Sequence, residues 1–395
     1  MPNLTTAEVP SSGVPLPELQ VQPVTTRGQR KQFLEFPWSL YRDDPHWIPP
    51  LRMNQKELVG YKKHPFYEEN EAQTFLATRN GTVCGRIAAI LDHGHNRYHK
   101  EQRGFFGFFE SVDDSEVATG LFTAVREWFA ARDIDQLRGP VNPSLNYECG
   151  LLVDAFDAPP TFMMTYNKPY YERLIEHVGF RKSQDLFSFW GHLEMLAGLD
   201  DKLAFIGDEA KKRFNVQVRS LDKSRFREEV DTYLKIYNAS LSSNWGFVPL
   251  SDSEARHFSA ALRWLIEPEL TCIAEVDGKV VGACFALLDY NPRIREMDGR
   301  LLPLGFLKLL RKRHDIKRIR AIATTVVPEY QKWGLSLVVL RGLLPKALDY
   351  GIEECEFSWV AESNRLSRRS LEKGGAKLTK THRLYDYPPP AGTGE

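Results

Sequence analysis

The feature that most constrains the fold of this chain is an internal repeat. The segment 77–85, which contains Asn80-Gly81, aligns with the segment 274–282, which contains Asp277-Gly278, and the offset is 197 residues (277 − 80). Asn-Gly and Asp-Gly dipeptides between β-type runs are typical of tight hairpin turns. A fold with two equivalent hairpins, far apart in the chain, is therefore predicted.

A second pair of segments supports the repeat. Residues 175–180 align with 371–376 at an offset of 196 (371 − 175). Two distant anchors at nearly one offset indicate two copies of one unit, and 395 residues are too many for one ordinary core. We expect a disordered tail over 1–19, which is rich in Pro, Ser and Thr, a first domain over 20–195 and a second over 196–395.

Composition narrows the class of protein. The chain carries 52 basic and 52 acidic residues, so overall charge gives no argument for a nucleic-acid partner. No apolar run reaches the roughly 20 residues that a membrane-spanning helix needs, and no secretory signal pattern opens the chain. The 5 cysteines are scattered and form no Cys-x-x-Cys pair. These features predict a reduced, cytoplasmic protein without a Cys-rich zinc site.

A strand, a polar loop and a helix are predicted over 319–352. The β-branched run that ends at Val327 is closed by Pro328, and the apolar positions from Leu337 onwards follow a helical pattern. Between them lies the loop Gln331-Lys332-Trp333-Gly334-Leu335-Ser336. Such a loop presents unpaired N–H groups at a helix N-terminus, which suits phosphate or pyrophosphate.

This loop resembles the acyl-coenzyme A (CoA) loop of the GNAT acyltransferases, whose pattern is Gln/Arg-x-x-Gly-x-Gly/Ala, with Ser336 at the last small position. A second GNAT-like motif begins at Asn364, which is expected to cap the next helix. The sequence departs from the family at Leu371, where many members carry a Tyr that protonates the leaving thiolate, and at Ala376, which replaces an aromatic residue. The resemblance implies acyl-CoA as co-substrate, bound by Val327, Gln331, Lys332, Trp333, Gly334, Leu335, Ser336 and Asn364.

The resemblance also implies an α/β fold with two tandem GNAT-like domains, each a mixed twisted sheet flanked by helices. The copies differ where the coenzyme would bind. In the first copy the strand 105–109 leads to a helix start with Asp113, Asp114 and Glu116, and Asp113 and Glu116 have the spacing of a capping box. Three carboxylates there would repel pyrophosphate, so we expect acyl-CoA in the second copy only.

The first copy instead contains a long excursion after residue 139. It carries Asn142, Asn146 and Tyr166 as candidate substrate-binding residues for an amine acceptor, with Tyr147 and Glu148 as candidate catalytic groups. The alternative is a proline-stiffened loop with no role in binding.

Direct attack of an amine on a thioester needs a base near the carbonyl. Glu362, at the end of a second-copy strand, is the carboxylate best placed for this role, and Glu110 and Glu148 are rivals. Each could instead be a helix cap or a surface charge. Cys149 has no evident His partner and is expected to be a buried small residue. The histidines between Asp92 and His99 could suggest metal ligands, but acyl transfer of this type needs no metal, so a polar hairpin end is expected.

The second copy has an insertion over 293–320. An apolar stretch, 301–310, is followed by basic residues that run to Arg320. This pattern is typical of a helix on an anionic membrane surface. The alternative is a helix packed on the neighbouring domain.

The segments 104–110, 139–144 and 358–364 resemble a narrower tandem group, the bacterial ceramide synthases, which acylate long-chain sphingoid bases. That resemblance implies a role in sphingolipid biosynthesis and a lipid amine reached from the cytoplasmic side. Three alternatives stay open: an N-acetyltransferase of a small-molecule or peptide amine, a non-catalytic acyl-CoA-binding protein, and a Fem-like protein that uses aminoacyl-tRNA.

Overall fold

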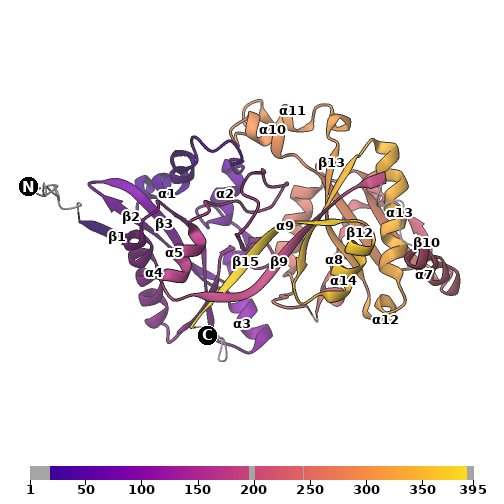
Figure 1. Cartoon of the computed structure of the whole chain (residues 1–395), viewed down its shortest axis with the longest axis horizontal. Coiled ribbons are helices and arrows are strands. Elements are labelled where there is room, and N and C mark those ends of the chain that lie inside the picture. Colours follow the sequence, from indigo (N-terminus) through magenta and orange to yellow (C-terminus); the bar gives the residue numbers. More distant parts are fainter. Residues whose placement is uncertain (1–17, 195–200, 243, 389–395) are drawn as a thin grey trace, which may run out of the picture.

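The computed structural model describes residues 18–194, 201–242 and 244–388 (Figure 1). Residues 1–17 of the predicted disordered tail lie outside the described residues, and Leu19 starts the first strand. The helices are α1 (Arg27–Leu40), α2 (Arg52–Leu58), α3 (His93–His99), α4 (Ser115–Ala130), α5 (Tyr171–His177), α7 (Asp201–Arg213), α8 (Phe226–Leu241), α9 (Asp252–Leu262), α10 (Asn291–Glu296), α11 (Gly305–Leu310), α12 (Pro328–Gln331), α13 (Leu335–Tyr350) and α14 (Arg365–Lys373). The strands are β1 (Leu19–Pro23), β2 (Glu71–Arg79), β3 (Thr82–Leu91), β4 (Arg103–Ser111), β5 (Gln136–Gly139), β6 (Val141–Asn142), β7 (Glu148–Cys149), β8 (Leu151–Leu152), β9 (Arg181–His192), β10 (Gln217–Arg219), β11 (Thr271–Val276), β12 (Lys279–Leu288), β13 (Arg318–Val326), β14 (Glu354–Ala361) and β15 (Lys377–Tyr387).

One mixed sheet runs through the whole molecule. Its strands follow the order β1-β2-β3-β4-β5-β15-β9-β14-β13-β12-β11-β10, while β6 and β7 form a small separate pair. Helices cover both faces, as the α/β class requires. Along β3, Ile87 and Ala89 lie in a core with α4, whereas Ala88 and Ile90 lie in a core with α1, because successive strand residues point to opposite faces.

The two predicted hairpins are confirmed. In β2–β3 the turn residues Asn80 and Gly81 have φ values of 48° and 73°, and in β11–β12 Asp277 and Gly278 have 51° and 73°. Both residues of each turn thus adopt the left-handed conformation of a type I′ turn. Even the irregularity of the ladder repeats, since the register shifts after Ala77 in one hairpin and after Ala274, 197 residues later (274 − 77), in the other.

The two halves of the chain, residues 18–194 and 201–388, exchange their last strands. β15, from the second half, pairs antiparallel with β5 of the first half, and β9, from the first half, pairs with β14 of the second. β9 and β15 also pair with each other at the centre of the sheet (Figure 1). Each half therefore completes the sheet of the other. The predicted boundary at 195/196 stays a prediction about sequence units.

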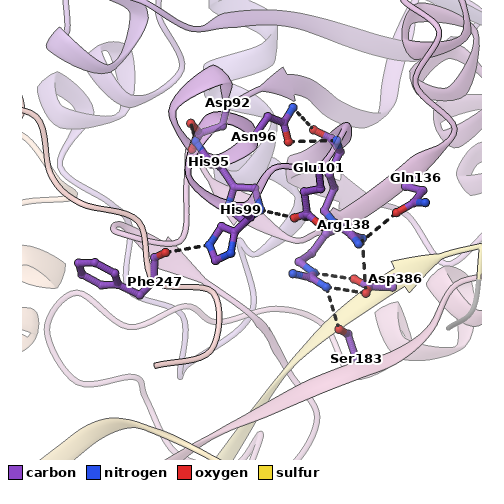
Figure 2. Close-up of polar contacts among 11 residues, drawn as sticks. Asp92, His95, Asn96, His99, Glu101, Gln136, Arg138, Ser183, Phe247 and Asp386 are labelled. Atoms are coloured by element: carbon purple, nitrogen blue, oxygen red, sulfur yellow. Dashed lines mark hydrogen bonds and ion pairs between the residues drawn. The ribbon is translucent and has the colours of Figure 1, made fainter. Parts of the chain in front are cut away.

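A buried charge network holds the exchanged strand β15 to the first half (Figure 2). Asp386 of β15 accepts two hydrogen bonds of 2.7 Å from the Arg138 guanidinium of β5. Arg103 of β4 lies 3.5 Å from the same carboxylate and also contacts Glu101, which in turn contacts His95. The segment predicted as a polar hairpin end thus forms the short helix α3, tied to this network.

The insertion 293–320 forms α10, α11 and the start of β13. Lys308, Arg311 and Lys312 of the predicted basic cluster are exposed, but the prediction that the cluster runs to Arg320 is wrong. Arg320 is 4% exposed and donates to Ser358 and to the backbone carbonyls of Phe162 and Met163. It lies on the strand β13 beside the junction of the halves, and strand residues that face the interior are buried whatever their charge. Within the described ranges, no helix is long and apolar enough to cross a membrane.

Candidate active site

The strands β4 and β5 separate early, and the gap between them opens the site. They pair only from Arg103 to Phe105, after which β4 continues to Ser111 paired with β3 on its other side. The chain that leaves β5 enters the gap: Asn142 accepts a hydrogen bond of 2.7 Å from the N–H of Phe108, and a Cβ on Gly107 would lie 1.7 Å from the carbonyl oxygen of Val141. Only glycine allows this close approach.

A cavity of about 470 Å³ lies beside this gap. That volume is within the range of about 300–1,000 Å³ typical of small-molecule sites. Both halves of the chain form its wall, and most of the wall is apolar. The polar groups come mainly from the first half (Arg86, Glu110, Asn142, Tyr147, Glu148, Tyr166), and much of the apolar wall from the second half (Phe258, Leu262, Trp264, Leu265, Ile294, Leu301, Phe306, Leu309).

Five of the predicted site residues therefore share one cavity, and Glu148 has the most unusual environment among them. Burial raises the pKa of its carboxyl to about 7, and the charge of Arg320 on β13 opposes that rise. Within the described part of the chain, no hydrogen bond to the Glu148 side chain is present, so its oxygens are free to meet a ligand. A carboxyl group with a pKa near neutrality at an apolar cavity can act as a general base.

Glu110, by contrast, is fully engaged. Tyr41 and Tyr171 each donate a hydrogen bond of 2.7 Å to one carboxylate oxygen, and Arg86 lies 3.7 Å from the other. Burial raises the pKa of the Glu110 carboxyl, while Arg86 and the two phenols oppose the rise. A carboxylate with these donors is better suited to orient neighbouring groups than to exchange protons.

Tyr147 and Asn146 are adjacent in the chain, but their side chains line different pockets. The hydroxyl of Tyr147 donates to Glu254 of α9 at 2.9 Å, and its ring stacks on Phe258, so it joins the two halves at the cavity wall. Burial raises the pKa of Tyr147. The amide of Asn146 instead donates to the carbonyl of Val248 and lines a smaller, separate pocket. The structure does not bring Asn146 to the cavity.

Glu362 also lies apart from this group. Its side chain is 41% exposed, forms an ion pair of 3.0 Å with Lys182, and does not line the cavity. Tyr166 does line it, with its hydroxyl donating to Asp44 at 3.1 Å. Cys149 is buried as expected, and burial raises the pKa of its thiol to about 12.

The predicted coenzyme loop begins helix α13. Gly334 is the N-cap residue, has φ = 79°, and receives no side-chain capping bond. The N–H groups of Leu335 and Ser336 belong to the first turn, where no intrahelical acceptor exists. Gln331 donates to the carbonyls of Val326 and Ser240 and so supports the loop.

The other residues of the predicted coenzyme set lie in the loop or at the start of another element. Val327 donates its N–H to Val281, Lys332 is exposed, and the indole of Trp333, 45% exposed, lies 4.0 Å from the Arg213 guanidinium. Asn364 caps α14 by accepting from the N–H of Ser367 at 3.1 Å, which confirms the predicted cap.

The equivalent helix of the first half, α4, differs in the expected way. Its N-cap is Asp114, whose carboxylate accepts from the N–H of Glu116, so the capping residue is Asp114 and not the predicted Asp113. Arg79 pairs with both Asp114 and Glu116. Carboxylates therefore already satisfy this helix N-terminus, whereas the N-terminus of α13 has none.

Sequence reasoning missed a histidine pair on the cavity wall. His64 is 3% exposed, and its Nδ1 accepts from the N–H of Phe66, which places the proton on Nε2. Its ring lies 4.7 Å from that of His257, which in turn lies 3.8 Å from Glu57. Burial lowers the pKa of His64 to about 4. These residues are separated by nearly 200 positions, so no local pattern could have indicated the pair.

Two curated proteins are similar to this chain over most of its length. No protein-family model matches the chain. It is 33% identical over 383 residues to the bacterial ceramide synthase of Caulobacter vibrioides, covering 93% of this chain and 97% of that protein. It is 32% identical over 372 residues to protein YghO of Escherichia coli, covering 93% and 94%.

Solved structures show the same fold. A tandem GNAT protein from the clavulanic acid biosynthesis pathway superposes with a TM-score of 0.56 at 13% identity, over 93% of this chain and 98% of that one. A GCN5-related N-acetyltransferase from Sphaerobacter thermophilus gives 0.52 at 12% identity, over 94% and 96%. The chain therefore has the tandem GNAT fold, and it belongs to the same family as the bacterial ceramide synthase of Caulobacter vibrioides and protein YghO of Escherichia coli.

Proposed function

We propose that this protein transfers an acyl group from acyl-CoA to a primary amine by direct attack, with Glu148 as the general base. The observation that carries the proposal is the Glu148 carboxyl, whose pKa is raised to about 7, at a largely apolar cavity between the two halves. In the reaction the amine nitrogen bonds to the thioester carbon and the C–S bond breaks. Glu148 takes one proton from the incoming ammonium, and the thiolate of CoA receives a second.

The donor is assigned to the second half. The uncapped N-terminus of α13 supports pyrophosphate binding there, since unpaired N–H groups and the helix dipole both favour an anion. The acceptor is assigned to the cavity, where Asn142 and Tyr166 offer polar contacts. Arg320 on β13 of the donor half carries a positive charge that opposes the rise of the Glu148 pKa.

The acceptor class we propose is a long-chain, sphingoid-type amine, acylated at the cytoplasmic face of a membrane. A largely apolar wall with carboxylates among its polar groups fits an amphiphile that has one cationic amine. The similarity to a bacterial ceramide synthase supports the same class.

A thiol-release assay tests the proposal. The purified protein is incubated with long-chain or short-chain acyl-CoA and a panel of sphingoid, small-molecule and peptide amines. Amine-dependent release of CoA thiol with sphingoid bases is expected. Release of thiol only with small-molecule or peptide amines would show that the acceptor is not a sphingoid base. Binding of acyl-CoA without release of thiol would indicate a non-catalytic binding protein.

Adding one carboxylate at the α13 N-terminus should strongly weaken acyl-CoA binding. Ser336 is exposed in the first turn of α13, where an acidic residue normally favours the helix. Ser336→Glu is therefore expected to keep or raise stability while it weakens acyl-CoA binding by at least about a hundredfold, because pyrophosphate meets a like charge. Isothermal titration calorimetry, with thermal unfolding in parallel, measures both effects.

Gly334→Glu should act in the same direction but also strain the backbone, since Gly334 has φ = 79° and a Cβ there would lie 2.6 Å from Ile206. Gly375→Glu is a matched control for positive φ, as φ is 87° and no heavy atom lies within 4 Å of its Cβ position. Unchanged acyl-CoA affinity in Ser336→Glu, or two equal sites per chain, would contradict the donor assignment.

A further inference from the structure

Four large apolar side chains stand exposed on one short stretch of the insertion. Leu302, Leu304, Phe306 and Leu307 are 70%, 65%, 42% and 60% exposed. They lie at or just before α11, at the top edge of the molecule in Figure 1. We call these four residues the apolar crown. Contiguous apolar side chains that are exposed on a protein surface commonly mark a site of interaction. We therefore expect the apolar crown to contact a partner.

The crown is continuous with the mouth of the cavity. Phe306 belongs to both, and Trp264 and Met53, which are 60% and 43% exposed, also line the cavity. Side chains that both line a cavity and reach solvent mark its opening. Behind them, Leu301 and Leu309 continue the apolar lining inward. An alkyl chain could therefore pass from the crown to the cavity without leaving apolar surroundings.

Two arginines hold this surface in place. Arg293 donates to the carbonyl of Leu309 at 2.9 Å and to those of Arg311 and Lys312, which satisfies the C-terminal end of α11. Arg313 pairs with Glu267 and donates to the carbonyl of Trp264. The crown and the cavity mouth are thus fixed relative to each other by the protein itself.

All charged residues within the segment 300–312, which contains the crown, are basic. The segment 300–312 contains Arg300, Lys308, Arg311 and Lys312 and no acidic residue. The last three are exposed, and in the described part of the chain none of them forms an ion pair. Exposed Leu and Phe beside unpaired Lys and Arg match the acyl boundary and the anionic headgroups of a lipid surface.

We propose that the apolar crown inserts into an anionic bilayer, so that the cavity mouth opens into the lipid and the alkyl chain of the amine enters sideways from the membrane. This inference rests on the proposed acylation of a lipid amine. A protein partner or a second copy seated on the crown would cover the mouth, whereas a bilayer would supply the substrate through it.

Flotation with vesicles tests the contact without acyl-CoA. Wild-type protein should float with phosphatidylglycerol-containing vesicles, and Leu302→Ser/Leu304→Ser/Leu307→Ser should lower the bound fraction at least about tenfold. These leucines are exposed and do not line the cavity. Leu366→Ser/Leu378→Ser, at leucines 72% and 51% exposed elsewhere, is the matched control and should float like wild type. Lys308→Gln/Arg311→Gln/Lys312→Gln should remove the preference for anionic over neutral vesicles.

Activity measurements with two kinds of amine distinguish an effect on substrate entry from an effect on the chemical step. The crown variant should lose at least about tenfold in kcat/KM for a long-chain amine embedded in vesicles, and stay within about twofold of wild type for a soluble short-chain amine. Equal flotation of the crown variant and wild type would overturn the proposal, as would a crown-dependent dimer seen by sedimentation with no vesicle binding. Failure of wild type to release thiol with any amine would refute the proposed function instead, because flotation does not depend on turnover.

Discussion

Glu148→Gln is expected to lower kcat/KM by about 10²–10⁴, the usual effect of removing a general base. The glutamine keeps the size of the side chain but cannot take a proton from the incoming ammonium. Acyl-CoA binding should be unchanged, since the donor is assigned to the α13 N-terminus. Steady-state thiol release measures the loss, and calorimetric titration with acyl-CoA checks that the donor site is intact.

The pH dependence of the same variant has a definite sign. Because burial raises the pKa of Glu148 to about 7, wild-type activity should rise as pH passes through about 7 and this limb should vanish in Glu148→Gln. A raised carboxyl pKa also means that the wild-type fold loses stability as pH rises through that value. Glu148→Gln avoids this loss, so its stability relative to wild type should increase from about pH 4.5, the ordinary pKa of a glutamate, to about pH 7, while its activity stays low.

The rival carboxylates give different outcomes. Glu110→Gln should disturb the hydrogen bonds from Tyr41 and Tyr171 and lower stability together with activity. Glu362 is exposed and paired with Lys182 outside the cavity, so Glu362→Gln should change kcat/KM little. Full activity in Glu148→Gln together with a hundredfold loss in Glu362→Gln would place the base directly after β14 and contradict the assignment.

Local sequence was sufficient for the elements that local chemistry decides. The Asn-Gly and Asp-Gly turns were predictable because left-handed φ values are tolerated by few residues. The Asn364 cap and the strand that precedes Pro328 follow equally local rules, and both are present. The acidic residues at the start of α4 were also predictable from the sequence, although the N-cap residue is Asp114 and not Asp113.

The pairing of strands that are far apart in the chain could not be predicted from local sequence. β9 and β15 each follow an equivalent helix, and nothing in their own residues states that each completes the sheet of the other half. The cavity wall depends on that exchange, because α9 reaches Tyr147 only once the halves are joined. Arg320 was assigned to a surface cluster for the same reason: its burial at the junction depends on Phe162 and Met163, more than 150 positions away.

Asp386→Asn should reduce the free energy of unfolding by about 3–5 kcal/mol, which is the usual cost of removing one partner from a buried ion pair. The side chains of Asp386 and Arg138 are only 7% and 11% exposed, and Arg103, also 11% exposed, shares the same carboxylate. Neutral asparagine would leave the largely buried Arg138 guanidinium without its counter-charge, while Arg103 would keep only its contact with Glu101 (Figure 2). Because Asp386 lies on β15, the loss should weaken the attachment of the exchanged strand to β5.

Asp208→Asn provides the matched control for this change. Asp208 pairs with Arg341 at the same distance of 2.7 Å, but the two side chains are 54% and 36% exposed. An ion pair at the surface is worth about 0–1 kcal/mol, since water and salt screen it. Urea denaturation followed by fluorescence compares the two variants, and hydrogen exchange along β15 shows whether the strand opens first in Asp386→Asn. Equal stability of Asp386→Asn and Asp208→Asn, with β15 still protected, would mean that strand pairing and core packing alone hold the exchanged strands, and that the buried charges only fix their register.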